Sequence, residues 1–432
     1  MKKPNLLFLY TDEQAFNTMA AYGNSRIDMP NLNRLARESV VFDEAYVTQP
    51  VCTPSRSTLL TGLYPHANGC TENNVPLKPE TLCLPEMLTG DEYITAHFGK
   101  WHLGDELYAQ HGFREWLSIE DGYNGYFTVG RDRSDRSDYH HWLVGQGFSP
   151  RDSQYEPEQV TMPPNFEALP GPEQPLKTRL LQRHYERNGH SGLSLSSECD
   201  WRRMIANYWG LCSLVDTHVG RILDVLDDCG LTDNTIVVFT SDHGDMMGAH
   251  GLIAKCVMYQ EAIRVQLMVR LPGRTPAKRI KGPVSQIDVV PTLLDLMNQA
   301  IPTYLQGKSL RPWFESGERA REDPVFVEWN GPDNGIGGDV KGAVRVPDWM
   351  KEMATAEEAS AACSDPVRTI INPDGWKFNC SPLGEHELYN VREDPQETRN
   401  VFGRERTRAR ELREQIVRWQ KETGDEVPLP EI

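Results

Sequence analysis

The sequence predicts an α/β fold in which helices cover both faces of a mainly parallel central sheet. Short apolar runs such as NLLFLY (5–10) and TIVVFT (235–240) are typical of strands that are buried on both faces. Segments with helical spacing of apolar residues lie between such runs, and this alternation is typical of parallel sheets. Beyond residue 318 the chain changes to short strand candidates and one charged helix. We therefore expect a main domain over residues 1–318 and a smaller α+β domain with a short antiparallel sheet over residues 319–432.

The first hundred residues are expected to alternate strands and helices. The first strand ends abruptly at the polar residues Thr11, Asp12 and Glu13. In the first helix, Leu32 and Leu35 share one face. The expected elements are a strand at 4–10, a helix at 30–38, a strand at 40–47, a helix that begins at Ser55 or Ser57, and a strand at 93–98.

The rest of the chain contains one poorly patterned stretch and then clear elements. Residues 105–200 are rich in Gly, Pro, Asp and Arg, and residues 162–175 (MPPNFEALPGPEQP) predict irregular structure. A long helix follows at 201–229 and is closed by Gly230. The later expected elements are strands at 235–240 and 264–270, a capped helix within 285–298 after a short strand, strands at 325–329, 367–371, 375–379 and 387–391, and a helix at 404–421.

The charge balance argues against a nucleic-acid partner. Of the 432 residues, 45 are Lys or Arg and 62 are Asp or Glu, which gives a net charge of −17, whereas nucleic-acid binding requires a basic surface. An anionic substrate remains compatible with this balance, because a few local cations outweigh distant negative charges. The sequence predicts no particular oligomeric state.

The sequence also bears on the compartment of the protein. No stretch approaches the roughly 20 apolar residues of a membrane-spanning helix, and the run from Leu6 to Tyr10 is too short for a signal peptide. We expect a cytoplasmic protein as the chain is written, or a periplasmic or secreted one if a leader was removed. The nine cysteines are scattered singly, which favours reduced thiols over a disulfide framework.

Polar side chains follow three of the expected strands. Asp12 and Glu13, Lys100 and His102, and Asp242 and His243 stand where strands end. Any one of these pairs alone is more typical of a solvated strand end. Together, carboxylates and imidazole at the carboxyl ends of neighbouring strands favour a divalent-cation site, and Lys100 and His102 favour a substrate with negative oxygens.

The stretch QPVCTPSRSTLLTG (49–62) places Cys52 four residues before Arg56. An arginine at this distance is able to lower the pKa of a thiol. On residue chemistry alone, an inert buried cysteine is nevertheless the favoured interpretation. Lys255, twelve residues after His243, fits a surface position as well as a site.

Several motifs, in order along nearly the whole chain, favour a functional role for Cys52 over an inert buried thiol. Cys52-Thr53-Pro54-Ser55-Arg56, followed by Thr61-Gly62, resembles the signature of the type I sulfatases, which belong to the alkaline phosphatase superfamily. The resemblance continues through PNLLFLYTDE (4–13), GKWHLG (99–104), FTSDHGDMMGAHG (239–251), KCVMYQEAIRV (255–265), IDVVPTLLDL (287–296), GKSLRPW (307–313) and HELYNVREDPQE (386–397).

The resemblance implies an alkaline-phosphatase-like fold and a specific site. It implies that Cys52 is oxidised to formylglycine, by a formylglycine-generating enzyme or an anaerobic maturase, and that its aldehyde hydrate attacks the sulfur of a sulfate ester. It assigns one Ca²⁺ to Asp12, Glu13, Asp242, His243 and the converted Cys52. Arg56, Lys100 and Lys255 would neutralise sulfate oxygens, and His102 would assist the diol. Glu13 departs from the family pattern, which usually has aspartate there.

A second departure lies between the GKWHLG motif and the long helix. Many type I sulfatases have there an apolar strand that ends in a Pro-His segment, whose histidine is a general acid or base. Residues 105–200 contain no such strand pattern. His140 and His141, in DYHHW, are the favoured replacements over His184 and His190, and surface histidines are the alternative.

The leading hypothesis is hydrolysis of sulfate esters on a sulfated carbohydrate or glycosaminoglycan-type saccharide. Tyr123, Tyr126, Trp142, Trp329 and Asn330 are candidate sugar contacts, although core or surface roles are the more common ones for such residues. The main alternative is a phosphodiesterase or phosphonate monoester hydrolase of the same superfamily. A binding protein that has lost its activity is the third hypothesis.

Overall fold

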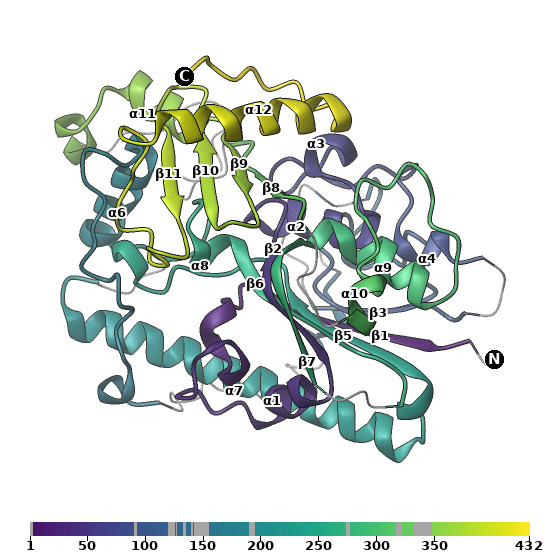
Figure 1. The fold of residues 1–432 in the computed structure, drawn as a ribbon. Coiled ribbons are helices and arrows are strands. Elements are labelled where there is room, and N and C mark those ends of the chain that lie inside the picture. The colour runs from purple at the N-terminus through teal and green to yellow at the C-terminus, as the bar shows by residue number, and fades with distance from the viewer. Residues whose placement is uncertain are drawn as a thin grey trace.

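The structure is a computed structural model and describes residues 3–89, 93–119, 126, 128–132, 135–139, 141, 155–189, 195–273, 277–316, 322–331 and 348–432. Its centre is a five-stranded sheet in the order β1-β5-β6-β2-β7, and a four-stranded sheet in the order β11-β10-β9-β8 lies beside it (Figure 1). The predicted fold class is confirmed.

The central sheet is mainly parallel because only one of its strands is reversed. β1 (Asn5–Thr11) pairs in parallel with β5 (Thr235–Ser241), and β2 (Val40–Tyr46) pairs in parallel with β7 (Lys278–Ser285). β6 (Arg264–Arg270) runs antiparallel to both β5 and β2. In the β1–β5 register Thr11 lies opposite Ser241, so the residues that follow the two strands, Asp12 and Asp242, lie at the same edge of the sheet.

The two faces of this sheet are buried by different helices. On one face, alternate strand residues such as Val237 and Phe239 pack with α1 (Pro30–Arg37) and the long α7 (Glu198–Asp228). On the other face, Ile236 and Val238 pack with α2 (Cys52–Thr61) and α9 (Val289–Leu296). The alternation of strand side chains thus produces two apolar cores. Among the helices that the structure describes, none combines the length and the apolar character that crossing a bilayer requires.

The C-terminal sheet is entirely antiparallel, as expected. Its strands are β8 (Val325–Glu328), β9 (Arg368–Ile371), β10 (Trp376–Cys380) and β11 (Glu387–Asn390). Helix α12 (Arg406–Thr423) covers one face through a cluster that includes Ile416 and Trp419. On the other face, Val325 and Val327 belong to the core of the main sheet. The expected domain boundary at 318/319 lies outside the described residues and stays a prediction.

One expected strand is in a different place. β3 (Ala96–Gly99) pairs in parallel with β4 (Glu115–Ser118) in a separate two-stranded sheet and not with the central sheet. Phe98 accordingly is 66% exposed, which would not occur inside a covered sheet. One contact connects the segments that precede β3 and β1, since the Tyr93 hydroxyl donates to the Pro4 carbonyl over 3.3 Å. Within the described residues β1 pairs only with β5.

The helices differ from expectation in two ways. α2 begins at Cys52, three residues before the earlier of its two expected starts. The helix includes Pro54 because a proline in the first turn lacks only an amide that would have no intrahelical partner. Several helices in poorly patterned segments were not expected. They are α3 (Pro65–Asn68), α4 (Leu84–Met87), α6 (Leu176–Asn188), α8 (Gln260–Ile263), α10 (Arg311–Ser316) and α11 (Ala356–Cys363). Residues 162–175 are irregular, as predicted.

Candidate active site

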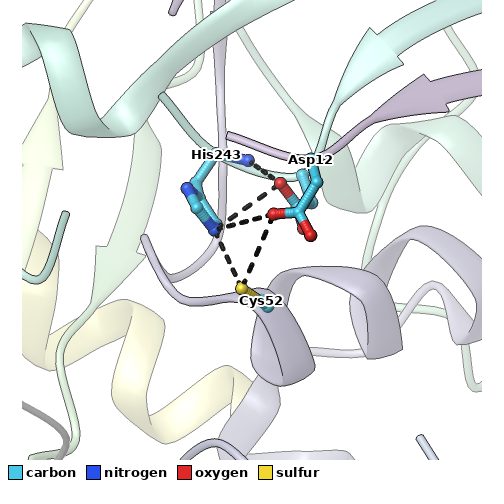
Figure 2. Close-up of side chains that lie close together, drawn as sticks. Asp12, Cys52 and His243 are labelled. Carbon is cyan, nitrogen blue, oxygen red and sulfur yellow. Dashed lines mark hydrogen bonds and ion pairs between the residues drawn. The ribbon is translucent and has the colours of Figure 1, made fainter. Parts of the chain in front are cut away.

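Cys52 lies where three elements meet. It is the first residue of α2, Asp12 follows β1, and Asp242 and His243 follow β5 (Figure 2). Its Sγ lies 3.2 Å from His243 Nε2 and 3.8 Å from Asp12 Oδ1. His243 Nε2 is also 3.6 Å from Asp242 Oδ1. The expected convergence of these four residues is therefore present.

The donor set of this group fits a divalent cation. One ligand atom from each of Asp12, Cys52, Asp242 and His243 lies within 4.8 Å of the other three. Two carboxylates and an imidazole suit a hard or borderline divalent ion, whereas the soft thiol of Cys52 is the poorest ligand of the four for Ca²⁺. Burial raises the pKa of the Cys52 thiol to about 12, and the neighbouring carboxylates act in the same direction. An oxygen at position 52 would complete the set better than sulfur does.

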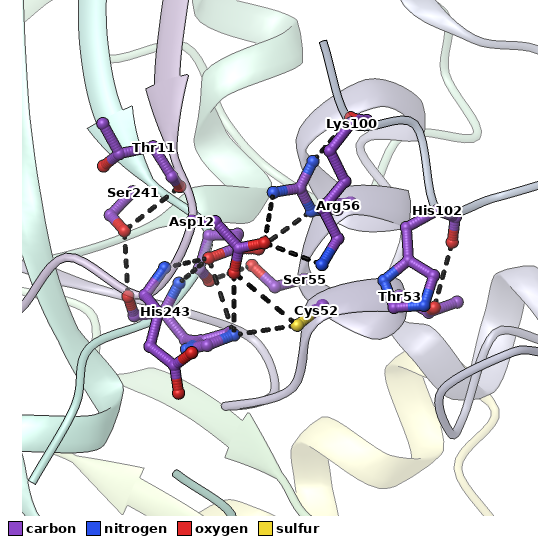
Figure 3. Close-up of polar contacts among 12 residues, drawn as sticks. Thr11, Asp12, Cys52, Thr53, Ser55, Arg56, Lys100, His102, Ser241 and His243 are labelled. Carbon is purple, nitrogen blue, oxygen red and sulfur yellow. Dashed lines mark hydrogen bonds and ion pairs between the residues drawn. The ribbon is translucent and has the colours of Figure 1, made fainter. Parts of the chain in front are cut away.

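Arg56 and Lys100 surround the carboxylates with positive charge (Figure 3). Because Arg56 is one helical turn after Cys52, it points to the same side of α2, and its Nε lies 2.8 Å from Asp242 Oδ2. Asp12 Oδ2 lies 2.7 Å from Lys100 Nζ and 3.4 Å from an Arg56 Nη. Burial alone would raise the pKa of Asp12, but the charges of Arg56 and Lys100 outweigh it and lower that pKa well below its usual range.

Lys100 reaches the site although its strand is not part of the central sheet. Arg56 Nη1 donates to the Lys100 carbonyl over 2.7 Å, which fixes the backbone just after β3. Figure 3 shows the side chains of Lys100 and Arg56 converging on Asp12 from the same side. Contacts made by side chains thus replace the strand pairing that the sequence predicted.

Glu13 and Lys255 form an ion pair of their own. Glu13 Oε1 lies 2.9 Å from Lys255 Nζ, and Glu13 has a positive φ of 62°, which turns its side chain away from the direction that Asp12 takes. Burial opposes the ionised form of Glu13, but Lys255 lowers its pKa. Glu13 is not a member of the four-ligand group. Its role as a metal ligand stays a prediction, and in this geometry it compensates Lys255.

His102 lies against the start of α2 and is held by neighbours from three segments. Its Nε2 lies 3.1 Å from Asn74 Oδ1, and its carbonyl accepts hydrogen bonds from the hydroxyls of Thr53 and Tyr126 at 3.0 and 2.9 Å. Both His102 and Asn74 have positive φ, at 60° and 64°. Burial, followed by the charges of Lys100 and Arg56, lowers the pKa of His102 to about 2. His102 is therefore neutral at physiological pH.

The candidate acid histidines do not join this group within the described residues. His141 is exposed, and its backbone N–H donates to the Ser137 carbonyl. His184 is half-buried on α6, with Nδ1 at 3.1 Å from the Asn188 amide. His140 and His190 lie outside the described residues. The replacement for the missing Pro-His histidine stays a prediction.

Two of the candidate aromatic sugar contacts are core residues, which is the role expected to be the more common one. Trp329 is 2% exposed, and the Lys177 ammonium lies 3.2 Å from its ring centroid, so that face is not open to a sugar. Tyr126 is buried, and its hydroxyl contacts Thr53. Asn330 donates to Gln49 and Glu328. Tyr123 and Trp142 lie outside the described residues.

Sequence reasoning missed the asparagines that support the site. Asn73 Oδ1 accepts from the Thr53 amide over 3.0 Å and so caps α2, while Asn74 contacts His102. Their only signal is the dipeptide itself, because residues of this loop follow neither helical nor strand spacing. A capping role for asparagine is readable in sequence only when it directly precedes the helix.

Comparisons with known proteins match most of the chain. A family model described as Sulfatase matches residues 4–299. An ulvan-active sulfatase of Formosa agariphila is 30% identical over 329 residues, which cover 71% of this chain and 64% of that relative. An N-acetylglucosamine-6-O-sulfatase of Bacteroides thetaiotaomicron is 25% identical over 516 residues, covering 99% of this chain and 88% of the relative.

Solved structures share the fold over nearly the full length. One protein, solved in complex with its substrate D-glucosamine-2-N,6-O-disulfate, matches with a TM-score of 0.73 at 21% identity, covering 99% of both chains. A phosphonate monoester hydrolase of Agrobacterium radiobacter matches with a TM-score of 0.74 at 20% identity, covering 97% of this chain and 96% of that one. At these identities the structures establish the fold alone.

Proposed function

Because the chain belongs to the sulfatase family, we propose that it hydrolyses sulfate esters with a formylglycine made from Cys52 and one Ca²⁺ held by Asp12, Asp242 and His243. The observation that carries this proposal is the position of Cys52. It lies at the N-terminus of α2, within 4.8 Å of three metal-ligand atoms. Formation of the aldehyde would require a formylglycine-generating enzyme or an anaerobic maturase as a partner.

The chain's own residues bind and orient a sulfate group beside residue 52. Arg56 and Lys100 are held near Asp12, and Lys255 is held by Glu13, so cations approach the site from two directions. Fixed cations of this kind stabilise charge that develops on substrate oxygens. Although burial opposes the charged form of Lys255, the Glu13 carboxylate stabilises it by charge and by a hydrogen bond, and the pKa of Lys255 is raised well above its usual value.

His102 supplies a neutral imidazole next to these cations. A neutral imidazole is able to accept a hydrogen bond from a hydroxyl at position 52 and so to orient that hydroxyl. When present, a hydrated aldehyde and a divalent cation would supply the activated oxygen that a buried thiol of high pKa does not.

Asn74 positions His102 in this proposal. Asn74→Ala is expected to lower kcat by roughly five- to tenfold, the effect of one lost neutral hydrogen bond. KM is expected to change less than about twofold, because the proposal has Asn74 act through the imidazole that it contacts. Asn74→Asp keeps the acceptor oxygen and is the matched control, expected to retain most of kcat. Steady-state kinetics of both variants test this. An Asn74→Ala variant with raised KM and normal kcat would place Asn74 on the substrate instead.

The substrate class we propose is a sulfated carbohydrate or glycosaminoglycan-type saccharide. The names of the relatives support it, since one acts on ulvan and another on N-acetylglucosamine 6-O-sulfate. The solved complex with a disulfated glucosamine adds a neighbour of the same chemistry. A phosphonate monoester hydrolase is the second candidate, because a protein of that name has the same fold.

One assay separates the two functions. A panel of 2-O-, 4-O-, 6-O- and N-sulfated disaccharides is incubated with the converted enzyme beside phosphate diesters and a phosphonate monoester. Sulfate release from at least one saccharide, at a kcat/KM well above that for the phosphorus esters, is expected. A preference for phosphodiester or phosphonate by several orders of magnitude would reverse the assignment.

A further inference from the structure

A second group of metal-ligand side chains lies away from the Cys52 site. Cys83 is the N-cap residue of α4, Glu86 is the third residue of that helix, and His111 comes from the loop between β3 and β4. One ligand atom from each of these residues lies within 4.8 Å of the other two. No residue of this group belongs to the sulfatase motifs of the sequence.

His111 points into this group and has an unsatisfied nitrogen there. Its side chain is only 5% exposed, and its Nδ1 has no hydrogen-bond partner among the described residues. The nearest acceptor, Glu86 Oε2, is 3.4 Å away, which is longer than an ordinary N–H···O bond. His111 also has a positive φ of 50°, an uncommon backbone conformation for this residue type. A buried imidazole nitrogen without a partner is costly, and a metal ion would satisfy it.

The capping geometry of α4 holds the other two ligands in place. The Cys83 amide donates to Glu86 Oε2 over 2.9 Å, and the Cys83 side chain accepts from the backbone amide of Glu86. Cys83 is fully buried in a cluster with Cys70, Trp101 and Leu103. The sulfur and the carboxylate are therefore held in place by helix capping and packing before any ion binds.

We propose that Cys83, Glu86 and His111 bind one Zn²⁺, with water as the fourth ligand. Sulfur, nitrogen and oxygen donors together suit zinc, in contrast to the oxygen-rich group at Asp12. Zinc bonds of about 2.0–2.3 Å bring such ligand atoms within about 4 Å of one another, so small side-chain rotations suffice. Binding releases the thiol proton of Cys83, and the affinity is therefore expected to rise with pH.

The site would brace the segment that carries two active-site residues. The rings of His111 and Phe113 lie 5.9 and 5.8 Å from the ring of Trp101. Trp101 stands between Lys100 and His102 in the sequence and is fully buried. A metal that joins α4 to the 111–113 loop would fix the two rings that pack against Trp101. This inference does not depend on the proposed reaction.

Metal binding in a Cys52→Ala background tests the site, because Cys52 is the other thiol that lies among metal-ligand side chains in the described part of the chain. We expect about one Zn²⁺ per chain by elemental analysis after dialysis, and a thiolate-to-metal absorption band on replacement by Co²⁺. Adding Cys83→Ala is expected to remove the band and to weaken zinc binding by at least tenfold. Adding Cys70→Ala, in the same apolar cluster, is expected to change neither.

A milder variant protects the test against misfolding. Glu86→Gln keeps an acceptor for the Cys83 amide but removes the carboxylate ligand, so it is expected to fold normally and to bind zinc at least tenfold more weakly. The proposal is overturned if the Cys52→Ala protein binds no zinc, or if zinc content and the cobalt band survive Cys83→Ala. Sulfatase assays are not part of this readout, so the proposal can fail independently of the proposed function.

Discussion

Replacing Cys52 with alanine is expected to abolish turnover while leaving the protein folded. In the proposed mechanism the side chain at position 52 is the nucleophile. Removing a nucleophile lowers kcat by roughly 10⁴-fold or more. Alanine is a good helix former, and the change removes a single sulfur atom from the first turn of α2. Activity assays and thermal unfolding of the same preparation measure both effects.

Cys52→Ser is the matched control for this prediction. Serine keeps a hydroxyl beside Asp12 and His243 but has only one oxygen on its β-carbon, so a sulfated serine has no second hydroxyl with which to expel sulfate. We expect the variant to be slow at best, or to accumulate as a covalent sulfate ester that mass spectrometry detects. Full activity of the alanine variant would remove residue 52 from the mechanism.

Replacing Arg56 with alanine is expected to lower both stability and turnover. Arg56 is 2% exposed and bridges Asp12 and Asp242, and Asp242 is fully buried. Breaking a buried ion pair by removing one partner costs about 3–5 kcal/mol, since the other charge is left uncompensated. Loss of one cation beside the sulfate position is expected to lower kcat by roughly 10²–10³-fold.

The stability effect is measured by urea unfolding in the presence of a chelator, so that a bound cation does not compensate the carboxylates. The double variant Arg56→Ala with Asp242→Asn is the control, because it removes the orphaned charge. It is expected to recover part of the free energy of unfolding and none of the activity. If Arg56→Ala unfolds within about 0.5 kcal/mol of the wild type, the typical range of surface changes, the ion pairs described here do not stabilise the fold.

Four strands of the central sheet, β1, β2, β5 and β6, were predictable to within one or two residues because apolar runs mark them. β7 was expected only as an unbounded short strand before the helix within 285–298, and it spans Lys278–Ser285. Thr235–Ser241 is buried along its whole length, and its end at Asp242 coincides with the change from apolar to polar residues. The same change located Asp12. Parallel pairing of β1 with β5 then brings these carboxylates together, which is why the core of the site followed from the sequence.

The position of β3 was not predictable from its sequence. Its apolar residues fit a buried strand, yet they pair with β4, a strand in a segment without clear periodicity. Strand partners depend on contacts between distant residues, and no local pattern encodes them. Lys100, which follows β3, still contacts Asp12, because its side chain is long enough to reach the central sheet.

Supporting residues outside the periodic elements were the least predictable, both at the Cys52 site and in the group of Cys83, Glu86 and His111. Asn74, Cys83 and His111 have no periodic neighbours, and their contacts arise from loops that the fold brings together. The ion pair of Glu13 with Lys255 likewise joins residues that are 242 positions apart. Glu13 forms this pair although the sequence predicted it as a metal ligand.

The chemical state of residue 52 is the most direct test of the central claim. The protein is produced with and without a formylglycine-generating enzyme, and mass spectrometry of the peptide containing residue 52 gives the converted fraction of each preparation beside its sulfatase activity. The account predicts that activity rises in proportion to the aldehyde fraction and vanishes where only thiol is found. Full sulfate-ester hydrolysis by a preparation in which Cys52 remains a thiol would contradict it.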